Sequence, residues 1–323
     1  MRAVIAPEPG GLDALQVAEL AIPEPAAGEV LIGIEAAGLN RADLLQRQGF
    51  YPPPPGITDV LGLECAGTIS AIGPGVDHFA VGDPVCALLA GGGYADFVAV
   101  PAGQVAAIPR GLSTVEAAGF METTCTVWSN LVMVAGLTQG ETLLVHGGTS
   151  GIGTTAIQVA KALGAQVVTT VGSDEKAAAA QELGADVVIN YRTQDFAQAM
   201  ADAGLSADVI LDIIGAKYLA PNVTALATNG RLVIIGMQGG IAAELNLAAL
   251  LGKRASVTAT SLRARPVSEK TDIVSRTIRN VVPMVEAGAV RPIVHATFDI
   301  ADVADAHRML ESSEHIGKLI LTL

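Results

Sequence analysis

The chain has 323 residues, and half of them are hydrophobic, so it is long enough to bury a core in each of two domains. Its formal net charge of −13 leaves no basic face to neutralise phosphates, which argues against nucleic acid or an anionic membrane surface as the main partner. No stretch reaches the roughly 18 continuous apolar residues of a membrane span, and we expect a cytoplasmic protein.

The three cysteines, Cys65, Cys86 and Cys125, are odd in number and far apart, and none belongs to a CxxC arrangement. This usage is typical of a reducing compartment, with neither a disulfide framework nor a structural zinc. We expect each of them to be a small buried hydrophobic residue.

The N-terminal part alternates short β-like runs with turns rich in glycine and proline. Such punctuation predicts a compact, highly curved β domain rather than a βα unit. The runs are residues 2–6, 28–34, 67–72, 82–87 and 94–100.

Residues 143–153, LLVHGGTSGIG, carry the most information, because an apolar strand leads directly into a glycine-rich turn and then a helix. Gly164 is placed to end that helix. A helix N-terminus has unpaired N–H groups, and residues without side chains let a pyrophosphate approach the backbone. A tight turn without a ligand would explain a lone glycine run equally well. The residues predicted to contact a dinucleotide here are Gly147, Ser150, Gly151, Ile152 and Gly153.

The context favours the dinucleotide, because strands and helices keep alternating after this turn. The predicted strands are residues 166–171, 187–191, 208–212, 231–236 and 256–260, with helices that begin near 174 and 217. This order predicts an α/β fold with a Rossmann doubly wound parallel sheet. A strand at 294–298, a helix at 301–311 and a last strand at 318–323 are predicted to return to the β domain.

The end of the second strand of this sheet indicates which dinucleotide binds. Residues 166–173 contain no acid to bind the ribose hydroxyls of NAD, whereas Ser173, Lys176 and Tyr191 together suit a 2′-phosphate. We therefore expect NADPH. Asp174 and Glu175 oppose this interpretation, and Lys176 alone is equally a solvated lysine in the first turn of a helix.

The whole chain resembles the medium-chain dehydrogenase/reductase superfamily. The resemblance rests on GLNRADLLQRQGFYPPPPG, LGLECAGTISAIGPGV, GGGYADF, HGGTSGIG and HIGKLILTL. Within the superfamily it resembles the zinc-independent NADPH quinone oxidoreductases, most of all the tumour-suppressor-inducible branch related to zeta-crystallin. The resemblance implies a mainly β, GroES-like catalytic domain of residues 1–122 and 290–323, and a Rossmann NADPH-binding domain of residues 123–289.

Zinc alcohol dehydrogenases of this superfamily use a Cys, a His-Glu pair and a second Cys at the catalytic metal. The corresponding positions here look like Asn40, Leu63 with Glu64, and Glu122. Amide and aliphatic side chains cannot replace thiolate and imidazole, so we expect no catalytic zinc. Reduction of an electron-poor acceptor needs no Lewis acid, and we expect hydride transfer to a quinone in a cleft between the domains.

By resemblance, Asn40, Asp43 and Tyr51 line the substrate side and Thr126 lies near the nicotinamide. Tyr51 is the candidate proton donor to the substrate oxygen, and its alternative is a loop aromatic packed against the prolines at 52–55. A second tyrosine that related reductases have near Leu45 is absent.

The family implies further contacts from strand-end loops and from a basic residue in the last strand, which approaches the phosphates. They are Ile214, Gly215, Gly236, Met237, Ser261, Leu262 and Lys318. Arg263 belongs to one of these loops, or forms an exposed basic pair with Arg265. We expect His146 to be a buried strand-end residue and Asp212 to shape its loop.

The strand at 256–260 would lie at the edge of the sheet, and an apolar edge invites a partner strand, so we expect a homodimer through it. Three rival functions stay open. They are reduction of enoyl thioesters, reduction of alkenals or other enones, and a nucleotide-binding structural or sensing role with little turnover.

Overall fold

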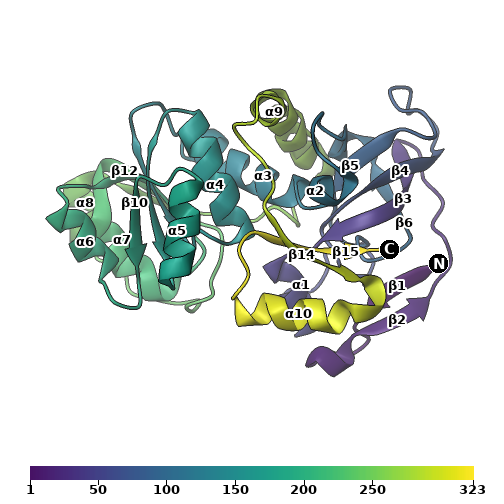
Figure 1. Ribbon diagram of the computed structural model, residues 1–323, viewed down its shortest axis with the longest axis horizontal. Coiled ribbons are helices and arrows are strands. Elements are labelled where there is room, and N and C mark those ends of the chain that lie inside the picture. The colour runs from purple at the N-terminus through teal and green to yellow at the C-terminus, as the bar shows by residue number, and fades with distance from the viewer. The chain divides into compact units, whose positions relative to one another are not determined.

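A computed structural model describes all residues from 1 to 323 (Figure 1). The chain forms two compact units: unit 1 is residues 1–125 with 262–323, and unit 2 is residues 126–261. The sequence predicts boundaries at 122/123 and 289/290. The second boundary differs because helix α9, Val267–Glu286, packs on residues of unit 1: a Cβ atom at Gly103 would lie 2.5 Å from the Thr271 hydroxyl oxygen.

Unit 2 is a six-stranded sheet in the order β10-β9-β8-β11-β12-β13, with every neighbouring pair parallel. This is the 3-2-1-4-5-6 order of a doubly wound Rossmann fold, and it confirms the predicted fold class. The strands are β8 Thr142–His146, β9 Gln166–Val171, β10 Val187–Asn190, β11 Ala207–Asp212, β12 Leu226–Ile234 and β13 Ser256–Ala259. The helices are α4 Gly151–Ala162, α5 Asp174–Glu182, α6 Phe196–Asp202, α7 Leu219–Ala225 and α8 Leu247–Lys253.

The helices of unit 2 begin and end where local chemistry dictates. Ser150 and Ser173 cap α4 and α5 by accepting hydrogen bonds from backbone N–H groups three residues later. Gly164 and Gly184 follow these helices with φ of +80° and +105°, a conformation that glycine adopts without strain. The predicted helix stop at Gly164 is therefore confirmed, and Gly184 ends α5 in the same way.

Unit 1 is built on a seven-stranded sheet in the order β14-β15-β3-β4-β5-β7, with β6 paired to β3, and on a separate β1-β2 pair. The strands are β1 Arg2–Ile5, β2 Gln16–Glu19, β3 Glu29–Gly38, β4 Glu64–Ile72, β5 Pro84–Leu88, β6 Phe97–Pro101, β7 Val105–Ala107, β14 Val294–Asp299 and β15 Lys318–Thr322. Strand β15 runs antiparallel to β3, with Ile320 opposite Gly38, so the predicted return of the C-terminal strands is confirmed.

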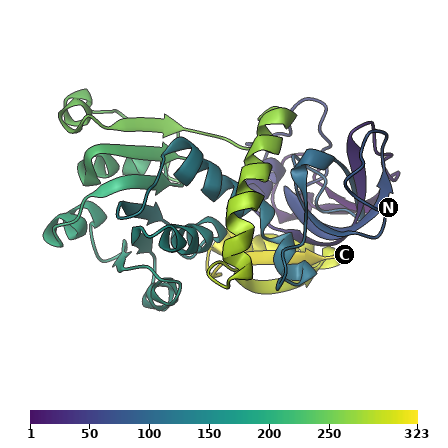
Figure 2. The same cartoon turned by 90° about the horizontal axis from the view of Figure 1, so that it is seen from above.

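Unit 1 also contains helices, of which one, α10, corresponds to a helix predicted from the sequence, at 301–311. They are α1 Arg41–Arg47, α2 Thr114–Ala118, α9 and α10 Val303–Ser312, while α3 Met121–Trp128 crosses the boundary between the units and continues as a π-helix at Ser129–Val134. Figure 2 shows α9, the longest of them, side-on. No helix is long and apolar enough to cross a membrane.

Candidate active site

The glycine-rich turn leads from β8 into α4 as predicted. Gly147 has a φ of +73°, and the Ser150 hydroxyl oxygen accepts a hydrogen bond of 3.0 Å from the Gly153 N–H. A Cβ atom at Gly153 would lie 2.2 Å from the Gly147 carbonyl oxygen, so only glycine allows the helix to approach the turn this closely. The N–H groups of Gly151 and Ile152 open the helix and have no acceptor within it.

These features fit the diphosphate of a dinucleotide, although packing explains part of the glycine content. A Cβ atom at Gly148 would lie 2.2 Å from the Thr169 hydroxyl oxygen of β9, so this glycine is required by the neighbouring strand. The two N–H groups at the start of α4 and the positive end of its dipole would hold the phosphates.

The loops that follow β8, β11 and β12 lie against one another at the carboxyl edge of the sheet. A Cβ atom at Gly147 would lie 2.8 Å from Ile213 Cδ1, and one at Gly236 would lie 2.7 Å from the Ile213 carbonyl oxygen. Gly215 has a φ of +78°, and a Cβ atom there would lie 3.1 Å from Met237 Cα. The structure thus brings Gly147, Ile214, Gly215, Gly236 and Met237 together, at the edge where doubly wound sheets bind ligands.

Asp212 shapes the loop after β11, as predicted. Its carboxylate accepts hydrogen bonds from the N–H groups of Ile214 at 2.6 Å and Gly215 at 3.1 Å, and from the Asn222 side chain at 3.1 Å. Burial raises the pKa of this carboxyl to about 6, and the three donors oppose that shift.

The three residues expected to bind a 2′-phosphate lie around the end of β9. The Ser173 hydroxyl oxygen accepts from the Lys176 N–H at 3.3 Å, and a Cβ atom at Gly172 would lie 2.6 Å from the Tyr191 hydroxyl oxygen. Tyr191 is 46% exposed. Asp174 accepts a hydrogen bond of 3.2 Å from the Asn190 side chain.

Thr126 is buried on α3 and is connected to the end of β13. Its carbonyl oxygen accepts from the Asn130 side chain at 2.8 Å, and Asn130 Oδ1 accepts from the Thr260 hydroxyl at 2.6 Å. Ser261, the last residue of unit 2, is exposed, and Leu262 opens the second part of unit 1.

In unit 1, Asp43 is buried beneath the start of α1 and does not line an open surface. Its carboxylate oxygen Oδ2 accepts from the Asn40 N–H at 2.7 Å, which forms a capping box, and from the Tyr94 hydroxyl at 2.7 Å. Its second oxygen has no partner. Burial raises the pKa of Asp43 to about 6. The resemblance places Asp43 on the substrate side, and the structure shows that its side chain is fully buried.

Asn40, Glu64 and Lys318 form a buried polar cluster. Lys318 Nζ lies 2.7 Å from Glu64 Oε1 and donates to Asn40 Oδ1 at 2.7 Å and to the Leu39 carbonyl at 2.6 Å. Asn40 Nδ2 donates to the same Glu64 oxygen at 3.0 Å, and the Glu122 N–H donates to the other. The expected contact of Lys318 with cofactor phosphates is not supported, because its ammonium group is buried among three oxygens of unit 1.

Tyr51 lies under the guanidinium of Arg263, whose Cζ is 5.3 Å from the centre of the tyrosine ring. Arg263 donates to the carbonyl oxygens of Tyr51 at 3.1 Å and Ala90 at 2.6 Å, and to Gln46 Oε1 at 2.7 Å. Arg263 is 5% exposed, so its interpretation as one of an exposed basic pair is wrong. The half-buried Tyr51 hydroxyl donates to no protein group, and burial raises its pKa.

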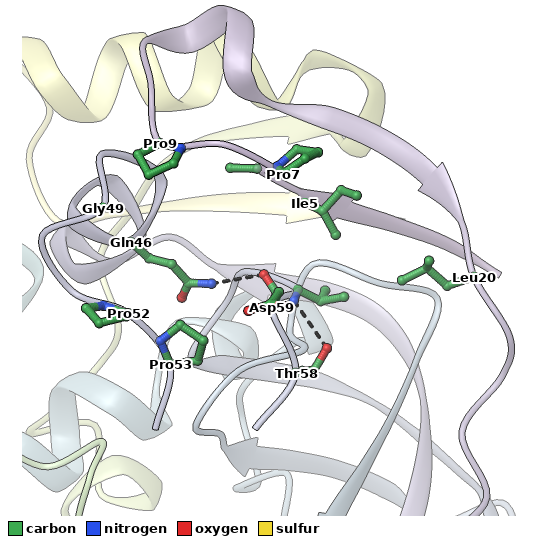
Figure 3. A pocket seen from close by; sticks show the side chains of 12 residues that line it. Ile5, Pro7, Pro9, Leu20, Gln46, Gly49, Pro52, Pro53, Thr58 and Asp59 are labelled. Carbon is green, nitrogen blue, oxygen red and sulfur yellow. Dashed lines mark hydrogen bonds between the residues drawn. The ribbon is translucent and has the colours of Figure 1, made fainter. Parts of the chain in front are cut away.

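A cavity of about 540 Å³ opens beside this loop and is drawn in Figure 3. Its lining is mostly apolar, with Pro7, Pro9, Pro52 and Pro53 on its walls. The Gln46 side chain joins the cavity to the tyrosine loop, because its Nε2 donates to the Asp59 carbonyl at 3.0 Å while its Oε1 accepts from Arg263.

Sequence reasoning missed the roles of Tyr94 and Gln46 and the anchoring role of Arg263. Each acts through a contact across a long sequence separation, since Arg263 lies 212 residues from Tyr51 and Tyr94 lies 51 residues from Asp43. The sequence carries no local signal for such pairs.

Two family descriptions match the chain: the alcohol dehydrogenase GroES-like domain at residues 26–110 and the zinc-binding dehydrogenase at residues 151–279. The Escherichia coli quinone oxidoreductase, solved with NADPH, is 30% identical, with a TM-score of 0.88 and coverage of 100% of this chain and 99% of that one. The CurK enoyl reductase is 29% identical, with a TM-score of 0.87 and coverage of 99% and 98%.

Among curated proteins, one subunit of the phenolphthiocerol/phthiocerol polyketide synthase of Mycobacterium tuberculosis is 34% identical over 98% of this chain. The chain spans only 14% of the length of that relative. The chain is 30% identical to the quinone oxidoreductase over nearly the whole length of both proteins, and both domain families match in the expected order. The chain therefore belongs to the medium-chain dehydrogenase/reductase superfamily of oxidoreductases.

Proposed function

We propose that the protein reduces quinones with NADPH by hydride transfer and without a metal ion. The observation that carries the acceptor side is Tyr51, whose hydroxyl has no protein partner while Arg263 fixes its ring and its backbone. A group held in this way is available to donate a hydrogen bond to the oxygen of an acceptor.

The cofactor side rests on unit 2. The start of α4 offers two N–H groups to a diphosphate, and at the end of β9 Gly172, the residue before Ser173, lies against the Tyr191 hydroxyl. Residues 166–173 contain no acid, and Asp174 follows them. The similar E. coli oxidoreductase was solved with NADPH, which agrees with this assignment. A bound NADPH would supply the hydride.

The chain's own residues would then supply a proton and positive charge on the acceptor side. A quinone that accepts a hydride gains one more proton to become the hydroquinone. A tyrosine phenol with its ordinary pKa is already protonated at neutral pH, and burial shifts the pKa of Tyr51 further upward, so the phenol can donate that proton or a hydrogen bond to the developing oxyanion. The guanidinium over the ring adds positive charge beside the acceptor.

A metal-independent reaction is supported by the partners of Glu64. This carboxylate is one of two acids, with Glu122, at the positions that resemble a zinc site, and it is ion-paired with Lys318 and hydrogen-bonded by Asn40 and the Glu122 N–H. Both oxygens of the Glu64 carboxylate therefore already accept hydrogen bonds from donors of the protein itself.

A second candidate is reduction of an enoyl thioester or another enone, and the likeness to CurK and to the polyketide synthase favours it. Both reactions use hydride transfer followed by protonation, but an enone is protonated on carbon after the hydride reaches its β-carbon. A nucleotide-binding protein of low turnover is the third alternative.

We also propose a homodimer through the exposed edge strand β13, which size-exclusion chromatography with light scattering would test.

The test is loss of NADPH or NADH absorbance with para-quinone, ortho-quinone, enone and enoyl-thioester acceptors in parallel. We expect NADPH-selective turnover of a quinone, and about a 100- to 10,000-fold lower kcat for Tyr51→Phe, the range that one proton donor contributes. Phe50→Leu is the matched control, because Phe50 precedes Tyr51 in the same loop and is 78% exposed.

Exclusive turnover of enoyl thioesters would replace the quinone assignment with the second candidate. Tight NADPH binding without turnover of any acceptor would favour the third. An unchanged kcat for Tyr51→Phe would remove the donor role from Tyr51 and leave hydride transfer in place.

A further inference from the structure

A chain of buried side chains in unit 2 joins the strand of the glycine turn to the loop after β11. His146, the last residue of β8, contacts the Thr170 hydroxyl through Nδ1 at 3.0 Å and the Asn222 amide oxygen through Nε2 at 2.8 Å. The amide nitrogen of Asn222 donates to Asp212 at 3.1 Å. The side chains of all four residues are at most 1% exposed.

Each end of this chain of side chains contacts the backbone of a loop that is predicted to bind the dinucleotide. At one end, the Gly147 N–H points at both the hydroxyl oxygen and the carbonyl oxygen of Thr170, at 3.4 and 3.1 Å. At the other end, the Asp212 carboxylate accepts from the N–H groups of Ile214 and Gly215. The chain therefore runs from the glycine turn to loop 213–215 without passing through solvent.

The hydrogen bonds fix the direction of the whole chain. Asp212 accepts from backbone N–H groups, so its carboxylate requires a donor from Asn222, and the amide oxygen of Asn222 then faces His146. Consequently His146 must carry its proton on Nε2 and accept from the Thr170 hydroxyl at Nδ1. Burial lowers the pKa of His146 to about 4, in agreement with a neutral ring.

Packing fixes the plane of the imidazole as well. The ring makes edge-on contacts with Phe196 and Tyr218, each with ring centres 4.7 Å apart, and these two rings also contact each other. A ring that is held by two aromatic side chains and by two hydrogen bonds has a single orientation.

We propose that His146 is a positioning residue that couples the glycine turn to loop 213–215 through Thr170, Asn222 and Asp212, so that both loops hold the dinucleotide in one arrangement. The coupling is a property of the chain and needs no ligand. Its effect on nucleotide affinity rests on the proposed function.

The first test measures NADPH affinity of the full chain by calorimetry. Thr170→Val removes the donor to His146 and should weaken binding about tenfold, the usual effect of a lost buried hydrogen bond. Thr170→Ser keeps the hydroxyl and should restore the wild-type affinity. Thr142→Val is the matched control, because Thr142 is a buried threonine at the opposite end of β8.

Asn222→Leu interrupts the chain at a second point and should weaken binding by a similar factor. Because both variants interrupt the same chain of hydrogen bonds, the double variant should bind about as weakly as the weaker single variant. The coupling would be overturned if the fold-losses in NADPH affinity of the two single variants multiplied in the double variant. Equal losses of affinity for Thr170→Val and Thr142→Val would overturn it as well.

The second test needs no nucleotide, so it stands even if the wild-type protein fails to bind NADPH. Amide hydrogen exchange at Gly215 should accelerate in Thr170→Val and not in Thr142→Val. Long-range nitrogen NMR should show His146 with its proton on Nε2. Unchanged exchange at Gly215, or a proton on Nδ1, would overturn the proposal, whereas failed NADPH binding alone would overturn only the proposed function.

Discussion

The two units bury polar side chains in different ways. In unit 1 the buried cluster of Asn40, Glu64 and Lys318 contains an ion pair, with the Lys318 ammonium 2.7 Å from the Glu64 carboxylate. In unit 2 the chain from Thr170 to Asn222 is neutral, and a charged group stands only at its end, where Asp212 meets backbone N–H groups. A buried ion pair is costly to break, because one charge stays buried without its partner. Breaking a hydrogen bond between neutral buried side chains costs less free energy.

The largest effect in this comparison should come from Lys318→Met. It leaves the Glu64 carboxylate buried without its cation, and we expect a loss of about 3–5 kcal/mol in the free energy of unfolding. Urea unfolding followed by circular dichroism measures it. Adding Glu64→Gln should recover much of the loss, and a single variant that loses under about 1 kcal/mol would show that the pair is not the anchor of the cluster.

A second effect concerns the two carboxyls whose pKa is raised by burial to about 6, Asp43 in unit 1 and Asp212 in unit 2. The folded protein binds these protons more tightly than the unfolded chain does, so each wild-type carboxyl destabilises the fold increasingly as pH rises from about 4 to 6. Asp43→Asn should therefore gain about 3 kcal/mol on the wild type between pH 4 and pH 7.

Asp212→Asn sharpens the same measurement. Its pH-dependent gain should match that of Asp43→Asn, but its stability at pH 4 should be lower, because Asp212 accepts from three donors and Asp43 from two. Unfolding curves at several pH values supply both quantities. A pH-independent difference between Asp43→Asn and the wild type would contradict the raised pKa of Asp43.

The smallest effect should come from Arg263→Gln. Arg263 is as buried as Lys318, but its hydrogen-bond acceptors are two backbone carbonyls and the Gln46 amide, so its removal breaks no direct ion pair. We expect a loss of about 1–2 kcal/mol by urea unfolding, with a raised KM for the acceptor because Tyr51 loses its anchor. A loss of unfolding free energy as large as that of Lys318→Met would show that removing either cation costs the same, and would contradict this distinction.

Local patterns made unit 2 predictable. The alternation of apolar runs with glycine stops at 164 and 184 determines strands and helices over short distances, and successive βα units of this kind form a doubly wound parallel sheet. Likewise, the sequence predicts that His146 is buried, because it ends an apolar strand.

Unit 1 was less predictable because its polar contacts join distant segments. The sequence shows Lys318 as a basic residue in the last strand, and nothing near it reveals that Glu64 and Asn40 receive its ammonium group. Similarly, Asp43 reads as a polar residue near a substrate, whereas the capping box with Asn40 and the Tyr94 hydroxyl draw it inside.

The place of β15 in unit 1 has a consequence for the order of folding. Lys318 reaches Asn40 across 278 residues of chain, and all of unit 2 is made between them as one continuous segment. During translation, the whole Rossmann sheet is therefore synthesised before Lys318, the cation that pairs with Glu64. The domain that begins the chain is the last to be finished, and a chain that stalls before β15 exposes the edge of β3 to pairing with other strands.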